Sequence, residues 1–161
     1  MRVTFTKERH RYSVLVERDQ ASTLFGYGPT GNPELPHDIL HFVAEAEFGL
    51  DHGIFGTLAA GMPTRIFIPV NPKETVKVWR RNRIKRLRVP EGRRSEELVG
   101  RIERRWHART LEPELLAKLD ALAAEWRALQ VGRSLTLEWP RPEGRKVRAP
   151  RKRRRPATAR R

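Results

Sequence analysis

The chain has 161 residues, with 34 Lys or Arg against 19 Asp or Glu, which gives a formal net charge of +15. It contains no cysteine, which excludes disulfides and thiolate metal sites, so any metal must be bound by His, Asp or Glu. No apolar run approaches the length of a membrane span, and no apolar signal region opens the chain. We therefore expect a cytoplasmic protein with no membrane partner.

The first part of the chain predicts a β-hairpin followed by a loop. Apolar and polar residues alternate over residues 1–18, with a charged connection in the middle, which is typical of two strands with one solvated face. Residues 19–35 are rich in Gly and Pro and predict a long loop, with a short strand at Thr23–Phe25.

The segment from Leu35 to Glu45 predicts an amphipathic helix. Pro36 suits the first helical turn, because its missing N–H is not needed there. The apolar residues that gather on one side, and should face the core, are Ile39, Leu40, Phe42, Val43 and Ala46. His37, His41 and Glu45 follow at spacings of four, with Asp38 beside them, on a stripe roughly opposite the apolar face. The stripe must face solvent, a cleft or another element.

This polar stripe is the candidate site. The chain has no Lys or Arg between Arg18 and Arg65, so imidazoles and carboxylates stand in a segment free of cations. That composition suits a divalent cation, because neutral histidines and ionised carboxylates are the ligand forms. We expect His37 and His41 as ligands, Glu45 as third ligand or catalytic base, and Asp38 as a ligand or as an orienting group. Zinc, manganese or iron would fit this donor set. The alternative is a solvated helix face without function.

The remaining pattern predicts more helices and a final strand. It indicates a short helix over residues 54–61 with Asp51 as its N-cap, followed by a strand within 64–70. Three further helices are predicted to begin at Asn71, Ser95 and Pro113, and a last strand covers 135–139. The terminal strand should pair with the N-terminal hairpin, because a hairpin alone is marginally stable. We therefore predict an α+β fold, with a small antiparallel sheet and four to five helices on one face. The strand order is left open.

The end of the chain is strongly basic. Residues 141–161 contain 11 Lys or Arg and one Glu, which predicts a disordered tail outside a single globular domain of residues 1–140. Such a tail can bind nucleic acid or another polyanion by releasing counterions, and its densest run is Arg151, Lys152, Arg153, Arg154 and Arg155. The alternative is a tail that only increases solubility.

Two resemblances concern the same helix. The chain resembles a family of small bacterial proteins of unknown function in three places: the run from Leu35 to Glu45, residues 53–61 and residues 131–140. This resemblance implies no activity. His37, Asp38 and His41 also resemble the His-Asp-x-x-His element of the ubiquinone-biosynthesis zinc proteins, in which a distant Glu completes the site. Gly53 stands here where that family carries the Glu.

Three interpretations of function remain open. The first is a metal site that, if catalytic, activates water for hydrolase or lyase chemistry. The second is a nucleic-acid-associated basic protein without catalytic activity. The third is a structural or interaction protein in which the histidines bond to a neighbouring element. Metal content separates the first from the others, and salt-dependent binding to DNA or RNA separates the second. The sequence predicts neither a substrate nor an oligomeric state.

Overall fold

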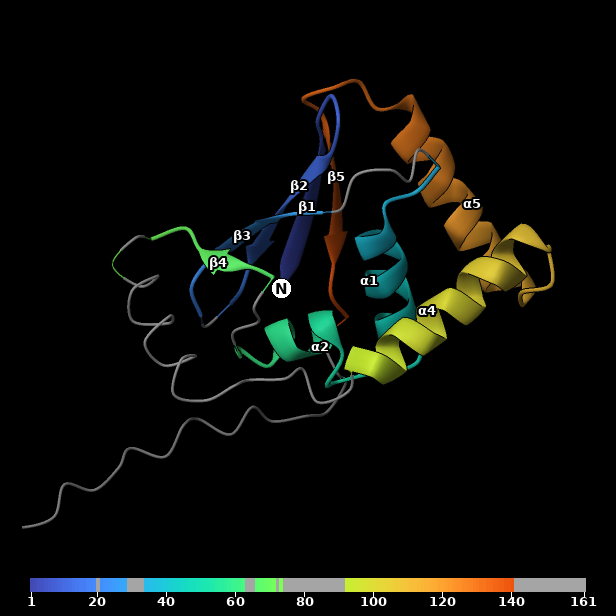
Figure 1. The fold of residues 1–161 in the computed structure, drawn as a ribbon, viewed down its shortest axis with the longest axis horizontal. Coiled ribbons are helices and arrows are strands. Elements are labelled where there is room, and N and C mark those ends of the chain that lie inside the picture. Colours follow the sequence, from blue (N-terminus) through green and yellow to red (C-terminus); the bar gives the residue numbers. More distant parts are fainter. Residues whose placement is uncertain (20, 29–33, 63–65, 72, 74–91, 141–161) are drawn as a thin grey trace, which may run out of the picture.

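Five strands form one sheet, in the order β4-β3-β2-β1-β5 with every neighbouring pair antiparallel (Figure 1). A computed structural model describes residues 1–19, 21–28, 34–62, 66–71, 73 and 92–140. The strands are β1 (Arg2–Lys7), β2 (Tyr12–Glu17), β3 (Leu24–Tyr27), β4 (Ile68–Pro69) and β5 (Ser134–Glu138). The N-terminal hairpin lies within residues 1–18, where the alternation predicts it. β3 overlaps the short strand predicted at Thr23–Phe25 but extends to Tyr27.

The two ends of the described chain meet in this sheet. β5 pairs with β1, so that Phe5 lies opposite Leu135, and the Trp139 N–H donates to the Met1 carbonyl over 2.9 Å. The prediction that the terminal strand joins the hairpin is confirmed. Val3 and Phe5 are fully buried on the inner face, as the period of two requires.

Four helices complete the described fold: α1 (His37–Glu47), α2 (Ile54–Ala59), α4 (Gly92–His107) and α5 (Pro113–Ala128). They lie on one side of the sheet, with α1 between the sheet and α4 (Figure 1). The predicted α+β class is therefore confirmed. None of the helices within the described ranges is long and apolar enough to cross a membrane.

Several helix ends differ from their predicted positions. Pro36 is the N-cap of α1, and the helix begins one residue later at His37. α4 begins at Gly92, three residues before the predicted start, which places Ser95 inside the helix. The Asn71 Oδ1 accepts the Lys73 N–H over 3.1 Å, as an N-cap does, but the predicted helix beyond it lies outside the described residues. The basic tail also lies outside them.

Candidate metal centre

The polar stripe of α1 is covered by other helices. Every residue of α1 from Asp38 to Glu45 is buried, because the sheet covers one side of the helix while α2 and α4 cover the other. His41 and Glu45 have no exposed surface, whereas the His37 side chain is 35 % exposed. The stripe therefore faces another element, which was one of the three predicted possibilities.

Two of the predicted residues meet a third that the sequence did not single out. The Nε2 atoms of His37 and His41 are 3.2 Å apart. The Glu96 Oε2, from the second turn of α4, is 3.5 Å from the His37 Nε2 and 3.4 Å from the His41 Nε2. We call these three residues the His/His/Glu cluster. It is a geometry in which one metal ion could contact all three side chains.

The dimensions of the cluster can be compared with those of common coordination geometries. A tetrahedral zinc ion with bonds of about 2.0–2.1 Å holds its ligand atoms about 3.3–3.4 Å apart. An octahedral ion with bonds of about 2.1 Å holds neighbouring ligands about 3.0 Å apart. The three separations in the cluster lie between 3.2 and 3.5 Å, which is closer to the tetrahedral value. Two histidines and one glutamate are also a known zinc ligand set.

Glu45 occupies a different place from the predicted third ligand. Its carboxylate accepts the backbone N–H groups of Ile54, Phe55 and Gly56 over 2.8, 2.7 and 3.2 Å. It also accepts the hydroxyl of Ser95 over 2.6 Å. Four donors thus surround a carboxylate with no exposed surface, and Glu45 is not among the three residues of the cluster.

The prediction that Asp51 caps the N-terminus of α2 was wrong. Gly53, not Asp51, is the N-cap, and no side chain at that position caps the helix. The Glu45 carboxylate supplies the missing acceptors from the neighbouring helix. A Cβ on Gly53 would lie only 2.3 Å from the Glu45 Cδ, so the carboxylate can reach α2 because this residue is glycine.

Asp38 is directed toward the sheet. The Tyr12 hydroxyl donates to the Asp38 Oδ2 over 3.0 Å, and the Asp38 N–H donates to the Tyr12 oxygen over 3.3 Å. Burial raises the pKa of Asp38, although the bond from Tyr12 and the nearby histidines oppose this effect. Burial, followed by the charge of Asp38, raises the pKa of Tyr12. The predicted orienting residue therefore ties α1 to β2 and does not belong to the cluster.

His41 connects Ser95 to the other two residues of the cluster. Its Nδ1 is 2.9 Å from the Ser95 hydroxyl, and its Nε2 faces His37 and Glu96. Burial, the largest single influence, lowers the pKa of His41, but the combined effects of Glu45, Glu96 and Asp38 outweigh it and raise the pKa. The serine is buried and bonded on both sides, so it is not placed as a nucleophile.

The spacing of residues in α1 could not identify Ser95 and Glu96 as parts of the site, because both lie far from α1 along the chain. Glu96 is 59 residues from His37, and Ser95 is 54 residues from His41. The start of a helix at Ser95 was the nearest signal, but helical periodicity does not specify which helix packs against which. The third histidine between Arg18 and Arg65, His52, is exposed and does not belong to the cluster.

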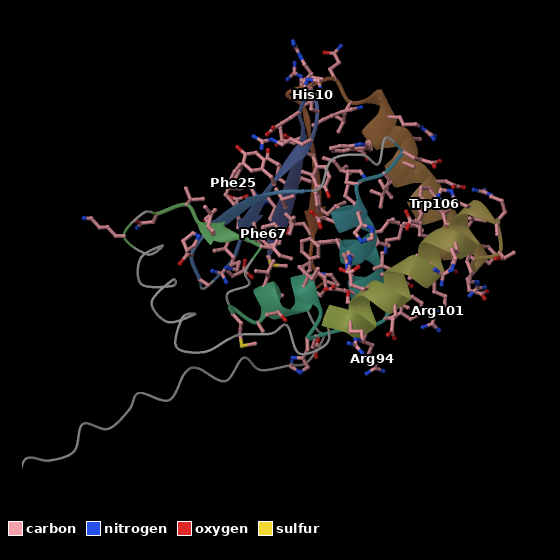
Figure 2. The ribbon with its side chains drawn as sticks, in the orientation of Figure 1. His10, Phe25, Phe67, Arg94, Arg101 and Trp106 are labelled. Carbon is pink, nitrogen blue, oxygen red and sulfur yellow. The ribbon has the colours of Figure 1, made fainter. Side chains whose placement is uncertain are left out.

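The predicted nucleic-acid residues, Arg151 to Arg155, lie outside the described residues. Within them, α4 carries exposed cations, and Figure 2 shows Arg94 and Arg101 pointing away from the body of the molecule. This arrangement is a charged outer surface on the helix that also supplies Glu96.

No family model matches the chain, and neither the curated proteins nor the solved structures gave a match. The resemblance to small bacterial proteins and the weaker resemblance to ubiquinone-biosynthesis zinc proteins therefore stay predictions.

Proposed function

We propose that the protein binds a divalent metal ion, preferentially zinc, through the Nε2 atoms of His37 and His41 and the carboxylate of Glu96. The observation that carries this proposal is the near-equilateral triangle of ligand atoms, with sides of 3.2, 3.4 and 3.5 Å. Manganese and iron remain chemically compatible with the same donors. The dimensions, being closer to the tetrahedral value, favour zinc among the three.

The position of the cluster leaves room for a further ligand from solvent. The Glu96 side chain is 59 % exposed and that of His37 is 35 % exposed, so the ion would lie at the molecular surface. Three protein ligands with a fourth position taken by water is the pattern of catalytic zinc sites, in which the ion lowers the pKa of the bound water. Hydrolase or lyase chemistry is the activity that such a water would support.

Within this proposal, Glu45 is not the catalytic base. Its two oxygens already accept four hydrogen bonds, and the side chain has no exposed surface from which to reach a substrate. We assign it a supporting role, developed below.

The test is zinc binding by the full chain, purified without a His-tag and measured by calorimetry and elemental analysis. We expect one zinc ion per chain. Glu96→Gln should weaken zinc binding by more than about 100-fold, beyond the 10–100-fold typical of residues that only support a ligand. Its matched control is Glu97→Gln, which changes the adjacent exposed carboxylate outside the cluster. His37→Ala and the exposed control His52→Ala form a second pair.

The ion should also stabilise the folded protein, by about 2.7 kcal/mol at a free concentration 100 times the Kd. Cobalt in place of zinc should give the intense visible absorption of a tetrahedral site, and the weak absorption of an octahedral site would argue for manganese or iron. Absence of zinc binding at micromolar concentration, or equal binding by Glu96→Gln and Glu97→Gln, would overturn the proposal.

A further inference from the structure

A series of hydrogen bonds connects the start of α2 to His41 through Glu45 and Ser95, and the donor and acceptor of each bond can be assigned. At one end of the series, the Glu45 carboxylate faces three backbone N–H groups at the start of α2. Each of these N–H groups can only donate, so the carboxylate serves as their acceptor. Its Oε1 is also 2.6 Å from the Ser95 Oγ.

The proton of Ser95 must therefore lie toward Glu45. A hydroxyl has one hydrogen, and two oxygens 2.6 Å apart need that hydrogen between them. If Ser95 donated to His41 instead, two acceptor oxygens would face each other in a buried site, which is costly. Since its hydrogen is used on Glu45, the Ser95 oxygen accepts from the His41 Nδ1, 2.9 Å away.

This direction determines the tautomer of His41. A neutral imidazole carries one N–H, and here that hydrogen is on Nδ1. The Nε2 lone pair is then free, and it faces the His37 Nε2 and the Glu96 Oε2. In the metal-free protein, the His37 Nε2–H can donate to it across 3.2 Å.

We propose that Ser95 and Glu45 are positioning residues that hold His41 in the Nδ1–H tautomer and present its Nε2 lone pair to the metal ion. The proposal rests on the proposed zinc site for its functional meaning, but the tautomer itself can be measured without metal. Metal-binding histidines generally donate their other N–H to an orienting acceptor, and loss of such a partner typically costs 10–100-fold in affinity. Here the acceptor is a serine whose own proton is fixed by a glutamate.

Glu45→Gln should reverse the two hydrogen bonds that Ser95 makes with residue 45 and His41. If the new amide nitrogen replaces Oε2, it faces the N–H groups of Phe55 and Gly56, which places three donors together. If it replaces Oε1, it faces only the Ile54 N–H and can donate to Ser95. The second arrangement leaves fewer donors unpaired and turns the Ser95 proton toward His41. The His41 Nε2 would then carry the hydrogen, and its lone pair would be lost to the ion.

The experiment is ¹⁵N–¹H correlation NMR of the His41 ring in the metal-free full chain, at a pH where the imidazole is neutral, followed by Zn²⁺ titration. The wild-type protein should show the Nδ1–H tautomer. Glu45→Gln should shift His41 toward Nε2–H and weaken Zn²⁺ binding by at least 10-fold. Ser95→Ala, which keeps a good helix former within α4, should give a mixture of tautomers with an intermediate affinity. Glu97→Gln should change neither readout.

An Nε2–H tautomer in the wild-type protein would overturn this inference, whether or not zinc binds. Unchanged tautomer and affinity in Ser95→Ala would also overturn it, and this variant settles the matter if Glu45→Gln fails to fold. A wild-type protein that shows the Nδ1–H tautomer but binds no Zn²⁺ would remove the proposed function and leave the hydrogen-bond assignment standing.

Discussion

Glu45 is the residue at which the most contacts of the site converge. Its backbone carbonyl accepts the Leu50 N–H just beyond the end of α1, while its carboxylate accepts the first N–H groups of α2 and the hydroxyl of Ser95. The backbone can turn so sharply between the helices because Gly49 has a φ of +62°. The Glu45 side chain thus connects α1 to both α2 and α4.

The closest neighbour of this carboxylate provides a sharp test. Gly53→Ala would place a Cβ 2.3–2.6 Å from the Glu45 carboxylate atoms, so the carboxylate must move away from the N–H groups that it caps. We expect the free energy of unfolding to fall by about 3 kcal/mol, from overpacking and from lost buried hydrogen bonds. Urea unfolding of the metal-free protein measures this change, and zinc affinity should fall with it.

Gly100→Ala is the matched control. Its added Cβ would meet only the end of the flexible Arg104 side chain, at 3.5 Å, and alanine is the better helix former. This variant should be more stable by about 0.5–1 kcal/mol. Equal effects of the two substitutions would show that the contact between Gly53 and Glu45 does not restrict the site.

The residue scale is also where prediction from sequence was least complete. Spacing placed His37, His41 and Glu45 on one stripe, and two of them do face the same point. Spacing could not show that Glu45 faces the start of α2, because that contact depends on the tight turn after α1. His41 and Glu45 are fully buried, so this part of the stripe is not a solvated helix face.

At the scale of elements, periodicity gave the strands and most helices, because alternate or helical burial follows directly from which residues are apolar. The apolar residues of α4 and α5 face inward accordingly, and Trp106 and Leu119 are among the buried ones. Periodicity did not predict the packing of α4 on α1, since amphipathic stripes do not encode partners. Glu96 could be identified as a candidate ligand only after that packing was known.

The corner between α4 and α5 carries a separate electrostatic contact. Arg109, with a φ of 57°, follows the end of α4, and its guanidinium donates twice to the Asp120 carboxylate over 2.7 Å. The Trp106 indole donates to the same carboxylate over 2.8 Å, and Figure 2 shows Trp106 on the part of α4 near this corner. Together these contacts connect the end of α4 and the corner to α5.

This corner predicts a pH dependence with a definite sign. The hydrogen bonds from Arg109 and then Trp106 lower the pKa of Asp120 to about 2. Because the folded pKa is below the unfolded value, the contribution to stability is present above about pH 4 and is lost as the pH falls through about 2. Asp120→Asn should therefore be less stable than the wild-type protein at pH 7, with a difference that shrinks between pH 4 and pH 2. Urea unfolding across this range measures it.

The exposed Glu125→Gln on the same helix serves as the control, and its effect should be small. If the difference in free energy of unfolding between the wild-type protein and Asp120→Asn stays constant down to pH 2, the substitution acts through packing and not through the charge of Asp120.

At the scale of the whole molecule, the two histidines of the cluster and the basic tail come from different segments of the chain. The segment that supplies His37 and His41 has no Lys or Arg from residue 19 to residue 64, whereas residues 141–161 carry 11 Lys or Arg and one Glu. The five described strands pair with one another, and the last of them, β5, pairs with β1 and ends at Glu138, before residue 141. The Trp139 N–H donates to the Met1 carbonyl. The described fold therefore does not depend on the tail for its strand pairing.

Removal of the tail tests this separation. A chain that ends at Pro140 should have nearly the same Tm as the full chain, because the removed residues include few apolar groups.

Binding to duplex DNA, by contrast, should change when the tail is removed. The logarithm of the affinity falls with the logarithm of the salt concentration, with a slope of about −0.9 per phosphate neutralised. The truncated chain should show a distinctly shallower slope, and two unrelated DNA sequences should give the same result. Arg101→Ala, in the full chain, removes one exposed cation of α4 and should change the slope by at most about 1. If truncation leaves the slope unchanged, the tail is not the polyanion-binding segment, and a loss of several degrees in Tm would show that it packs on the fold.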